Sequence, residues 1–157
     1  MCMECDISLA LRRVGESFPF SWEGRLAPEE FGGECIAFPE PVRIAGAFCF
    51  DGVALMVTGA CTVPVLRSCA RCNAAAAQSV VLRFAERFLR EAEEDEAYTY
   101  GGDTLSLERM FWDAFWLHLP MTALCLADCE SACSEETDKK NPFAVLRTLH
   151  VESAGQE

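Results

Sequence analysis

The sequence predicts an α+β domain: an antiparallel sheet of about five strands, open or curled into a partial barrel, with one main amphipathic helix. Two observations lead to this class. Asp51-Gly52, between two apolar runs, is the strongest short hairpin signal in the chain. Residues 106–119 instead repeat their apolar side chains at three- and four-residue steps up to Pro120, which is typical of an amphipathic helix. A cysteine-bearing segment follows and is expected to fold back to the turn that holds Cys69 and Cys72.

Length and composition favour one ordered domain over residues 1–157. Of these residues 51% are hydrophobic, and a chain of this length is too short to form two domains that each have a sizeable hydrophobic core. The net charge is −12. Residues 1–80 hold nine acidic and six basic residues, and residues 81–157 hold 16 acidic and seven basic ones, so most of the negative charge is in the second half. Such a surface repels phosphate backbones and attracts basic proteins. We expect no secretion leader or membrane span, and hence a cytoplasmic protein with reduced thiols.

The first 41 residues are predicted to hold one strand and then an irregular segment. Residues 6–11 alternate polar and apolar side chains, as a half-buried strand does. Residues 1–5, with the pair Cys2 and Cys5, are expected to be frayed. Residues 14–41 contain four prolines, a glycine pair and five large aromatic residues. We therefore expect an irregular segment there that wraps the core with its aromatic side chains.

The rest of the predicted sheet comes from four apolar runs in the middle of the chain. Residues 42–50 and 53–58 flank the Asp51-Gly52 turn, and residues 61–66 and 79–84 follow, the last continuing toward residue 88. Pro64 lacks a backbone donor and therefore indicates a sheet edge or a bulge within the third run.

An acidic loop and the main helix follow the sheet. Residues 91–103 are expected to form the loop, because five of the six residues 91–96 are acidic. Ser106 is the predicted N-cap of the helix. Trp112 and Trp116 lie four residues apart on a face beside the apolar stripe. They form a binding surface unless the sheet or the aromatic N-terminal segment covers them.

Ten cysteines carry the main chemical information in the sequence. Cys69 and Cys72 are two residues apart in a turn between two predicted strands, and Cys125, Cys129 and Cys133 follow more than 50 residues later at intervals of four. Two thiolates from each group would complete a tetrahedral zinc site. Our choice for the second pair is Cys129 and Cys133, with Cys125 as the reserve.

The spacing leaves open whether the chain holds one structural Zn²⁺ or none. Intervals of four are less common in zinc sites than shorter ones, and reduced cysteines are often simply buried, as we expect for Cys35, Cys49 and Cys61. A redox role for Cys69 and Cys72 is weaker, because thioredoxin-like pairs begin a helix and this pair lies between strands. Any zinc would be structural, since no His-rich or HExxH-type pattern supplies an open catalytic position.

Several of these motifs together resemble the YceD family of large ribosomal RNA subunit accumulation proteins. They are Cys69-Ala70-Arg71-Cys72-Asn73, Leu119-Pro120, the series Cys125, Cys129 and Cys133, and Lys140-Asn141-Pro142-Phe143-Ala144-Val145-Leu146. Their order and spacing cover roughly the C-terminal two thirds of the chain. Many relatives have one more cysteine, where this chain has Glu136, and others lack most of the later ones. The resemblance therefore leaves the metal undecided.

The resemblance implies a non-enzymatic factor that supports accumulation of 23S ribosomal RNA. Its expected partner is a precursor of the large ribosomal subunit or a small basic ribosomal protein, with direct RNA contact left open. We expect no catalytic residue, membrane or small-molecule substrate. A short terminal helix from Asn141-Pro142 and a frayed end at residues 150–157 are also expected. The residues assigned to partner binding are Arg71, Asn73, Trp112, Trp116, Asn141, Pro142 and Phe143.

Two other functions stay open at this point. One is a thiol-redox or zinc-dependent enzyme that uses Cys69 and Cys72. The other is a structural interaction module with no link to ribosomes.

Overall fold

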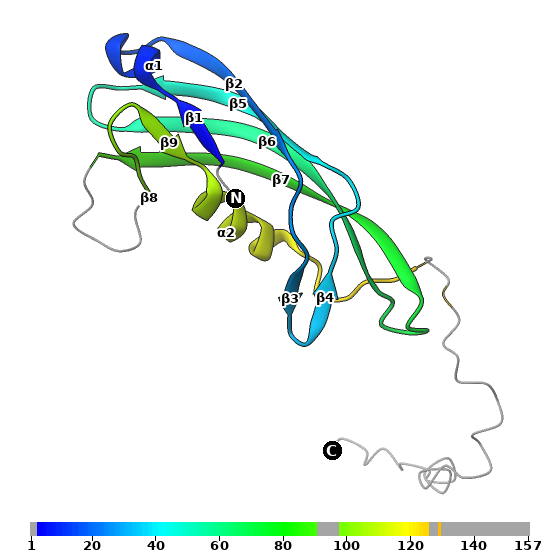
Figure 1. Ribbon diagram of the computed structural model, residues 1–157. Helices are drawn as coiled ribbons and strands as arrows, with labels where there is room; N and C mark the ends of the chain where they lie inside the picture. The colour runs from blue at the N-terminus through cyan, green and yellow to red at the C-terminus, as the bar shows by residue number, and fades with distance from the viewer. Residues whose placement is uncertain (1–2, 91–97, 126–128, 130–157) are drawn as a thin grey trace, which may run out of the picture.

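The computed structural model describes residues 3–90, 98–125 and 129, and a five-stranded sheet forms its centre (Figure 1). The strand order is β2 (Ser17–Gly24), β5 (Val42–Phe50), β6 (Leu55–Ser68), β7 (Ala75–Leu89) and β8 (Tyr98–Thr99). All neighbours are antiparallel except β7 and β8, which run parallel. The predicted α+β class with about five strands is confirmed, and the sheet stays open rather than closing into a barrel.

Two small sheets and two helices complete the described fold. β1 (Glu4–Asp6) pairs with β9 (Thr104–Ser106), and β3 (Glu29–Phe31) pairs with β4 (Glu34–Ile36). The helix α2 (Glu108–His118) and the β1–β9 pair lie on the same side of the large sheet (Figure 1). The helices described, α1 (Ser8–Arg12) and α2, have five and 11 residues, and neither is long enough to cross a bilayer.

The predicted strand at residues 6–11 is wrong. A strand ends at Asp6 and α1 begins at Ser8, whose backbone N–H donates to Asp6 Oδ1 at 2.8 Å. Ile7 and Ala10 are both buried and lie three residues apart, so the short alternation belongs to a helical turn. Met3 is buried as well and Glu4 begins a strand, so residues 3–5 are not frayed as expected.

Residues 14–41 contain three strands instead of the irregular segment that their prolines suggest. β2 alternates exposed and half-buried residues, and its aromatic side chains Phe18, Phe20 and Trp22 pack against the core. Pro19 is tolerated because β2 is the edge of the large sheet, where one backbone donor faces away from the ladder. The aromatic residues therefore cover the core, as expected, but from a regular strand.

The hairpin at Asp51-Gly52 is confirmed, and the strand after it is longer than predicted. Asp51 Oδ1 accepts the backbone N–H groups of Val53 and Ala54 at 2.8 and 2.7 Å. β6 then continues through both runs that the sequence suggested as separate strands. Its pairing with β5 ends at Thr62, so Pro64 lies where β6 has no β5 neighbour and costs no bond to that strand.

Two glycines face each other in the middle of the large sheet. Phe20, Gly46, Gly59 and Phe84 are consecutive partners across β2, β5, β6 and β7. A Cβ on Gly46 would lie 2.7 Å from the Phe20 ring, and one on Gly59 would lie 2.6 Å from the Phe84 ring. Each ring therefore occupies the space that a side chain on the opposite residue would need. This arrangement lets Phe20 stack on Phe48, with ring centroids 4.3 Å apart.

The predicted helix is present but begins later than expected. Ser106 is the last residue of β9, and Leu107 is the N-cap, without a side-chain hydrogen bond. Trp112 and Trp116 are half-buried. Phe38 meets Trp112 edge-on, and Phe31 stacks on Trp116 with centroids 5.0 Å apart. The segment around β3 and β4 thus covers part of the tryptophan face.

The predicted loop at residues 91–103 is only partly described. Tyr98 and Thr99 form β8 on the edge of the large sheet, and residues 91–97 lie outside the described part of the chain. The Tyr98 hydroxyl donates to Asp113 Oδ2 at 3.0 Å, which ties this edge strand to α2.

Candidate metal centre

Cys69 and Cys72 lie in the turn that joins β6 to β7, as predicted. Two backbone hydrogen bonds close the turn: Cys69 N–H donates to Ala74 O at 2.8 Å, and Asn73 N–H donates to Cys69 O at 2.9 Å. Asn73 has a φ of 59°, a left-handed conformation that asparagine adopts more readily than most residues. Asn73 therefore has a structural task in shaping the turn, besides the partner-binding role that the sequence suggests.

The chain after α2 returns to this turn. Its backbone bonds to the turn directly, since Ala70 N–H donates to Ala123 O at 2.8 Å. The Arg71 guanidinium donates to Cys129 O at 2.9 Å. The predicted juxtaposition of the Cys69–Cys72 turn with the later cysteine segment is thus present for the described residues. Arg71 holds the later segment in place.

Four thiols meet where the two segments touch. The Sγ atoms of Cys69, Cys72, Cys125 and Cys129 all lie within 4.8 Å of one another. Cys69 is 3.7 Å from Cys129, and Cys72 is 3.6 Å from Cys125. These four residues form the cysteine cluster. Cys125 is thus brought together with Cys129, while Cys133 lies outside the described residues.

The sulfur spacing fits a tetrahedral metal. With Zn–S bonds of about 2.3 Å, the edge of a regular tetrahedron of sulfurs is about 3.8 Å. The Cys69–Cys129 and Cys72–Cys125 sulfur distances match this edge, and both are far longer than a disulfide bond of about 2.05 Å. The cluster could therefore bind a metal such as zinc.

Backbone N–H groups stabilise the thiolate of Cys69, the form of the sulfur that binds a metal. The N–H groups of Cys72, Arg71 and Cys125 lower the pKa of Cys69 to about 6, because they stabilise its thiolate. Hydrogen bonds with Cys125 and Cys72, together with burial, raise the pKa of Cys129 to about 12. A bond with Cys129 lowers the pKa of Cys125, but a bond with Cys72 and burial outweigh it, so the net shift is upward.

A partly buried ion pair, which the sequence does not predict, lies beside the cluster. Arg67, 6% exposed, precedes the turn by two residues. Its guanidinium donates to Glu34 Oε2 at 3.2 and 2.7 Å and to Pro120 O at 2.6 Å. Glu34 Oε1 accepts the Ser68 N–H at 2.8 Å. The hydrogen bond from Arg67 lowers the pKa of Glu34 most.

This ion pair joins three parts of the chain next to the cysteines: β4, β6 and the segment after α2. No local pattern signals it, because Arg67 is 33 residues from Glu34 and 53 from Pro120. Through Arg67 it links the end of β6, which leads into the Cys69–Cys72 turn, to Pro120, which leads into the segment with Cys125 and Cys129.

Other predicted residues lie away from the cluster or outside the described chain. Cys61 is buried, as expected, and Cys49 is half-buried. Cys35 is exposed, so its assignment to the core is wrong: β3 and β4 form a small separate hairpin. His118 is exposed, and its Nδ1 lies 2.8 Å from Ala114 O. The remaining predicted residues, Asn141, Pro142 and Phe143, are not among those that the structure describes.

Comparison with known proteins gives one family and a small group of relatives. The model of the family described as "Large ribosomal RNA subunit accumulation protein YceD" matches residues 57–150, which is 94 of the 157 residues. Uncharacterized proteins of Mycobacterium bovis and of two strains of Mycobacterium tuberculosis are each 28% identical over 142 residues, covering 85% of this chain and 68% of the relative. No solved structure matches the chain.

Proposed function

The chain belongs to the YceD family, and from this premise we propose that it is a non-enzymatic assembly factor of the large ribosomal subunit. In this role it supports the accumulation of 23S ribosomal RNA in the cytoplasm. The observation that carries the proposal is the family match, because it includes most of β6, all of β7 and α2, and all four members of the cysteine cluster.

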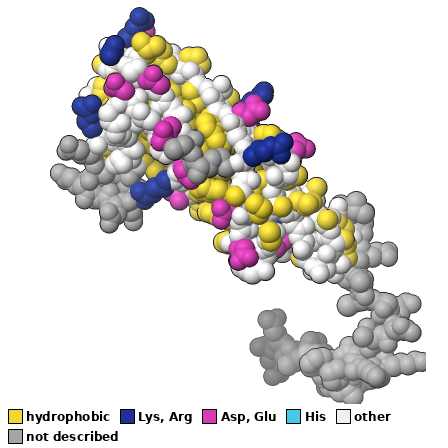
Figure 2. Space-filling model, in the orientation of Figure 1, with side chains coloured by type: hydrophobic (Ala, Val, Ile, Leu, Met, Phe, Trp, Pro, Cys, Tyr) yellow, Lys and Arg dark blue, Asp and Glu magenta, His cyan; other side chains and the backbone are white. Residues whose placement is uncertain are grey.

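Charge supports a basic partner. The net charge of −12 disfavours broad contact with an RNA backbone and favours a positively charged protein. On the face shown in Figure 2, acidic and basic side chains are both scattered among hydrophobic ones. We therefore take the direct partner to be a small basic ribosomal protein or a precursor particle that displays one. The half-buried tryptophans of α2 and the turn residues Arg71 and Asn73 are the candidate contacts.

A zinc ion held by the cysteine cluster would have a structural role. Four thiolates fill the coordination shell of zinc and leave no open position for a substrate or water. It would therefore act as a cross-link between the turn and the later segment. Hydrogen bonds from Arg71 and Ala70 also hold the later segment against the turn, and Arg67 holds the start of that segment at Pro120.

A thiol-redox function is the second candidate, because the pKa of Cys69 is lowered to about 6 and its sulfur lies 3.7 Å from that of Cys129. Two features weigh against it. The cluster holds two similarly close sulfur pairs rather than one. The turn also lies between strands, without the helix N-terminus that thioredoxin-like thiols use.

The deciding experiment replaces the native protein in its own host with variants and measures the ratio of 23S to 16S ribosomal RNA. Depletion should lower this ratio, and the wild-type chain should restore it. Cys69→Ser and Cys125→Ser should fail to restore it, whereas Cys35→Ser, which changes an exposed cysteine outside the cluster, should succeed. An unchanged ratio after depletion would reject the proposal.

Metal analysis of the same proteins separates the zinc and redox functions. The wild-type chain and Cys35→Ser should carry about one zinc per chain after purification without added metal, and the two cluster variants should carry much less. A metal-free wild-type protein whose thiols form a reversible disulfide near the thioredoxin potential would favour the redox function instead.

A further inference from the structure

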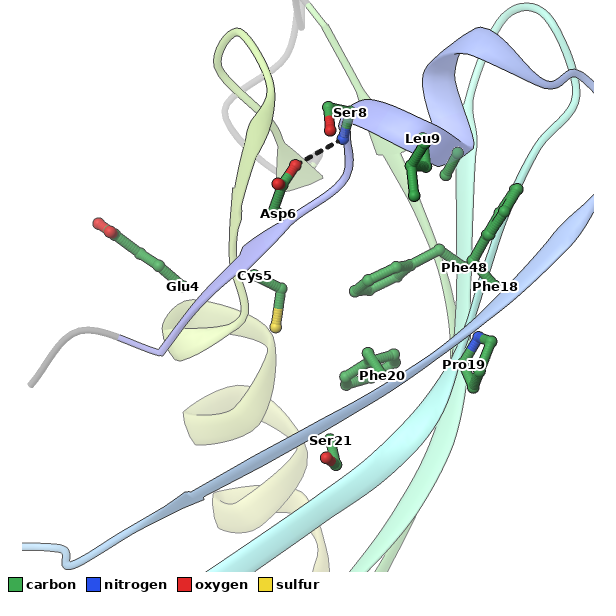
Figure 3. A pocket seen from close by; sticks show the side chains of 11 residues that line it. Glu4, Cys5, Asp6, Ser8, Leu9, Phe18, Pro19, Phe20, Ser21 and Phe48 are labelled. Atoms are coloured by element: carbon green, nitrogen blue, oxygen red, sulfur yellow. Dashed lines mark hydrogen bonds between the residues drawn. The ribbon is translucent and has the colours of Figure 1, made fainter.

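A second site lies at the opposite end of the sheet from the cysteine cluster. It is a pocket of about 400 Å³ between β1 with α1 on one side and β2 with β5 on the other (Figure 3). The volume is within the range of binding pockets, about 300 to 1,000 Å³. Among the described residues, the four cluster thiols and the predicted partner residues Arg71, Asn73, Trp112 and Trp116 do not line it.

The interior of the pocket is apolar. The stacked rings of Phe20 and Phe48 form its floor, and Phe18, Leu9 and the thiol of Cys5 form its walls (Figure 3). Leu9 is 58% exposed although it stands beside aromatic side chains, and burial raises the pKa of the half-buried Cys5 thiol. A single exposed leucine is ordinary, but one beside several aromatic rings in a cavity indicates a surface that can bury an apolar group.

Acidic and hydroxylic side chains lie beside the pocket. Ser8 and Ser21 line it, none of its lining residues is basic, and the carboxylates of Glu4 and Asp6 extend from the outer face of β1, away from the cavity (Figure 3). The backbone N–H of Ser8 lowers the pKa of Asp6, and Arg12 adds a smaller effect in the same direction. A segment paired with β1 would place alternate side chains beside these carboxylates, which would attract lysine or arginine and repel acidic residues.

The two strands at the mouth are both at sheet edges. β1 pairs only with β9, and β2 is the outer strand of the large sheet, among the strands that the structure describes. An extended segment can lie along such an edge, and alternate side chains then enter a neighbouring pocket. Pro19 removes one backbone donor from the β2 edge. Side chains would therefore contribute more to binding than a continuous ladder of backbone bonds.

We propose that this pocket binds a bulky apolar side chain of an extended, lysine- or arginine-rich segment of a partner protein. The occupant follows from the combination of an aromatic floor, two carboxylates on the outer face of β1 and two strand edges. The inference rests on the proposed function in one respect: it gives the place where the chain would hold its basic ribosomal partner.

Two labelled peptides of about ten residues test the pocket by fluorescence anisotropy with the full chain. One is lysine-rich with a central leucine–phenylalanine pair, and the other has alanines in place of that pair. Leu9→Lys adds a positive charge at the pocket wall, and Leu117→Lys makes the same change at an 83% exposed leucine of α2, away from the pocket. Glu4→Gln removes one negative charge from the outer face of β1.

The wild-type chain should bind the leucine–phenylalanine peptide at least about tenfold more tightly than the alanine peptide. Leu9→Lys should weaken binding by about tenfold, Glu4→Gln by a few fold at low salt, and Leu117→Lys should leave it unchanged. Equal binding of the two peptides, equal effects of the two lysine variants, or no binding at all would overturn the proposal. So would a dimer that Leu9→Lys dissociates, since a second copy would then be the occupant.

The ribosomal RNA ratio keeps this proposal separate from the proposed function. If depletion lowers the ratio and Leu9→Lys restores it fully, the pocket proposal fails while the assembly role stands. If depletion has no effect on the ratio, the assembly role fails whatever the peptides show.

Discussion

Arg67 donates two hydrogen bonds to a single carboxylate oxygen of Glu34, at 2.7 and 3.2 Å, and the two residues come from strands of different sheets. The Arg67 side chain is 4% exposed and that of Glu34 is 26% exposed. The third guanidinium nitrogen of Arg67, Nη1, donates to Pro120 O, at the point where the chain leaves α2. The pair therefore connects the small β3–β4 sheet, the large sheet and the segment that carries two cluster thiols.

Replacing Arg67 by alanine should be strongly destabilising. It leaves Glu34 without its counter-ion and Pro120 O without its donor. Breaking a buried pair costs about 3 to 5 kcal/mol, and the partial exposure of Glu34 places the expected loss near about 3 kcal/mol. Arg43→Ala is the matched control, because Arg43 also bonds one carboxylate, that of Glu23, but is 72% exposed. Arg43→Ala should lower the free energy of unfolding, measured in urea, by less than about 1 kcal/mol. Equal losses of stability in the two variants would contradict the role given to Arg67.

Acid should remove the stabilisation that Glu34 provides. The pKa of its carboxyl is lowered in the folded state from 4.5, chiefly by the hydrogen bond from Arg67. A lowered pKa means that the fold favours the carboxylate, so this contribution is complete above pH 4.5 and is lost as the pH falls through the lowered value. The gap in urea midpoint between wild type and Glu34→Gln should be clear at pH 7 and should shrink by pH 3. A gap of constant size would show that the carboxylate charge has no part in it.

A side chain at Gly59 should disrupt the middle of the large sheet. A Cβ there would lie 2.6 Å from the Phe84 ring and 2.6 Å from Ala45 O, and the backbone oxygen cannot move aside without breaking the β5–β6 ladder. Gly59→Val should therefore cost about 3 kcal/mol or more. Ala60→Val, one residue along on the exposed face, should change stability by about 0.5 kcal/mol or less. Comparable losses for the two variants in thermal unfolding would refute this account.

Removing a metal from the cysteine cluster should loosen one end of the molecule only. Its cysteines pack in a small group with Ala76 and Ala123, separate from the main core. Hydrogen exchange after chelation, or in Cys125→Ser, should accelerate at the Ala70 amide, which bonds to Ala123 O across the two segments. Amides in the middle of β5 and β6 should keep their protection. A global loss of protection would mean that the metal supports the whole fold.

Local patterns in the sequence predict the elements that local chemistry determines. The Asp51-Gly52 turn forms through bonds within four residues, and α2 follows a clear three- and four-residue apolar repeat that ends before Pro120. The thiol turn is predicted for the same reason, since both of its cysteines belong to one short connection. Partners that are close in sequence leave a readable pattern.

The features that were predicted wrongly, or not at all, depend on contacts between residues far apart in the sequence. β2 looks irregular because of Pro19, and only its place at the sheet edge makes the proline harmless. The alternation at residues 6–11 fits a strand and a short helix equally well, and burial of Ile7 and Ala10 decides between them. The choice among Cys125, Cys129 and Cys133 depends on where the chain runs after Pro120, which Arg67 and Ala70 fix from distant positions.

The length of β6 sets the reach of any partner. Phe48, on the pocket floor, is opposite Val57, and Ser68 precedes the cysteine turn, so the two sites are separated by 11 residues along one strand. At about 3.3 Å per residue that is about 36 Å. A compact ligand that fills the pocket cannot touch the thiol end at the same time. One elongated molecule must run the length of the sheet to engage both sites, or two separate molecules can occupy them without colliding.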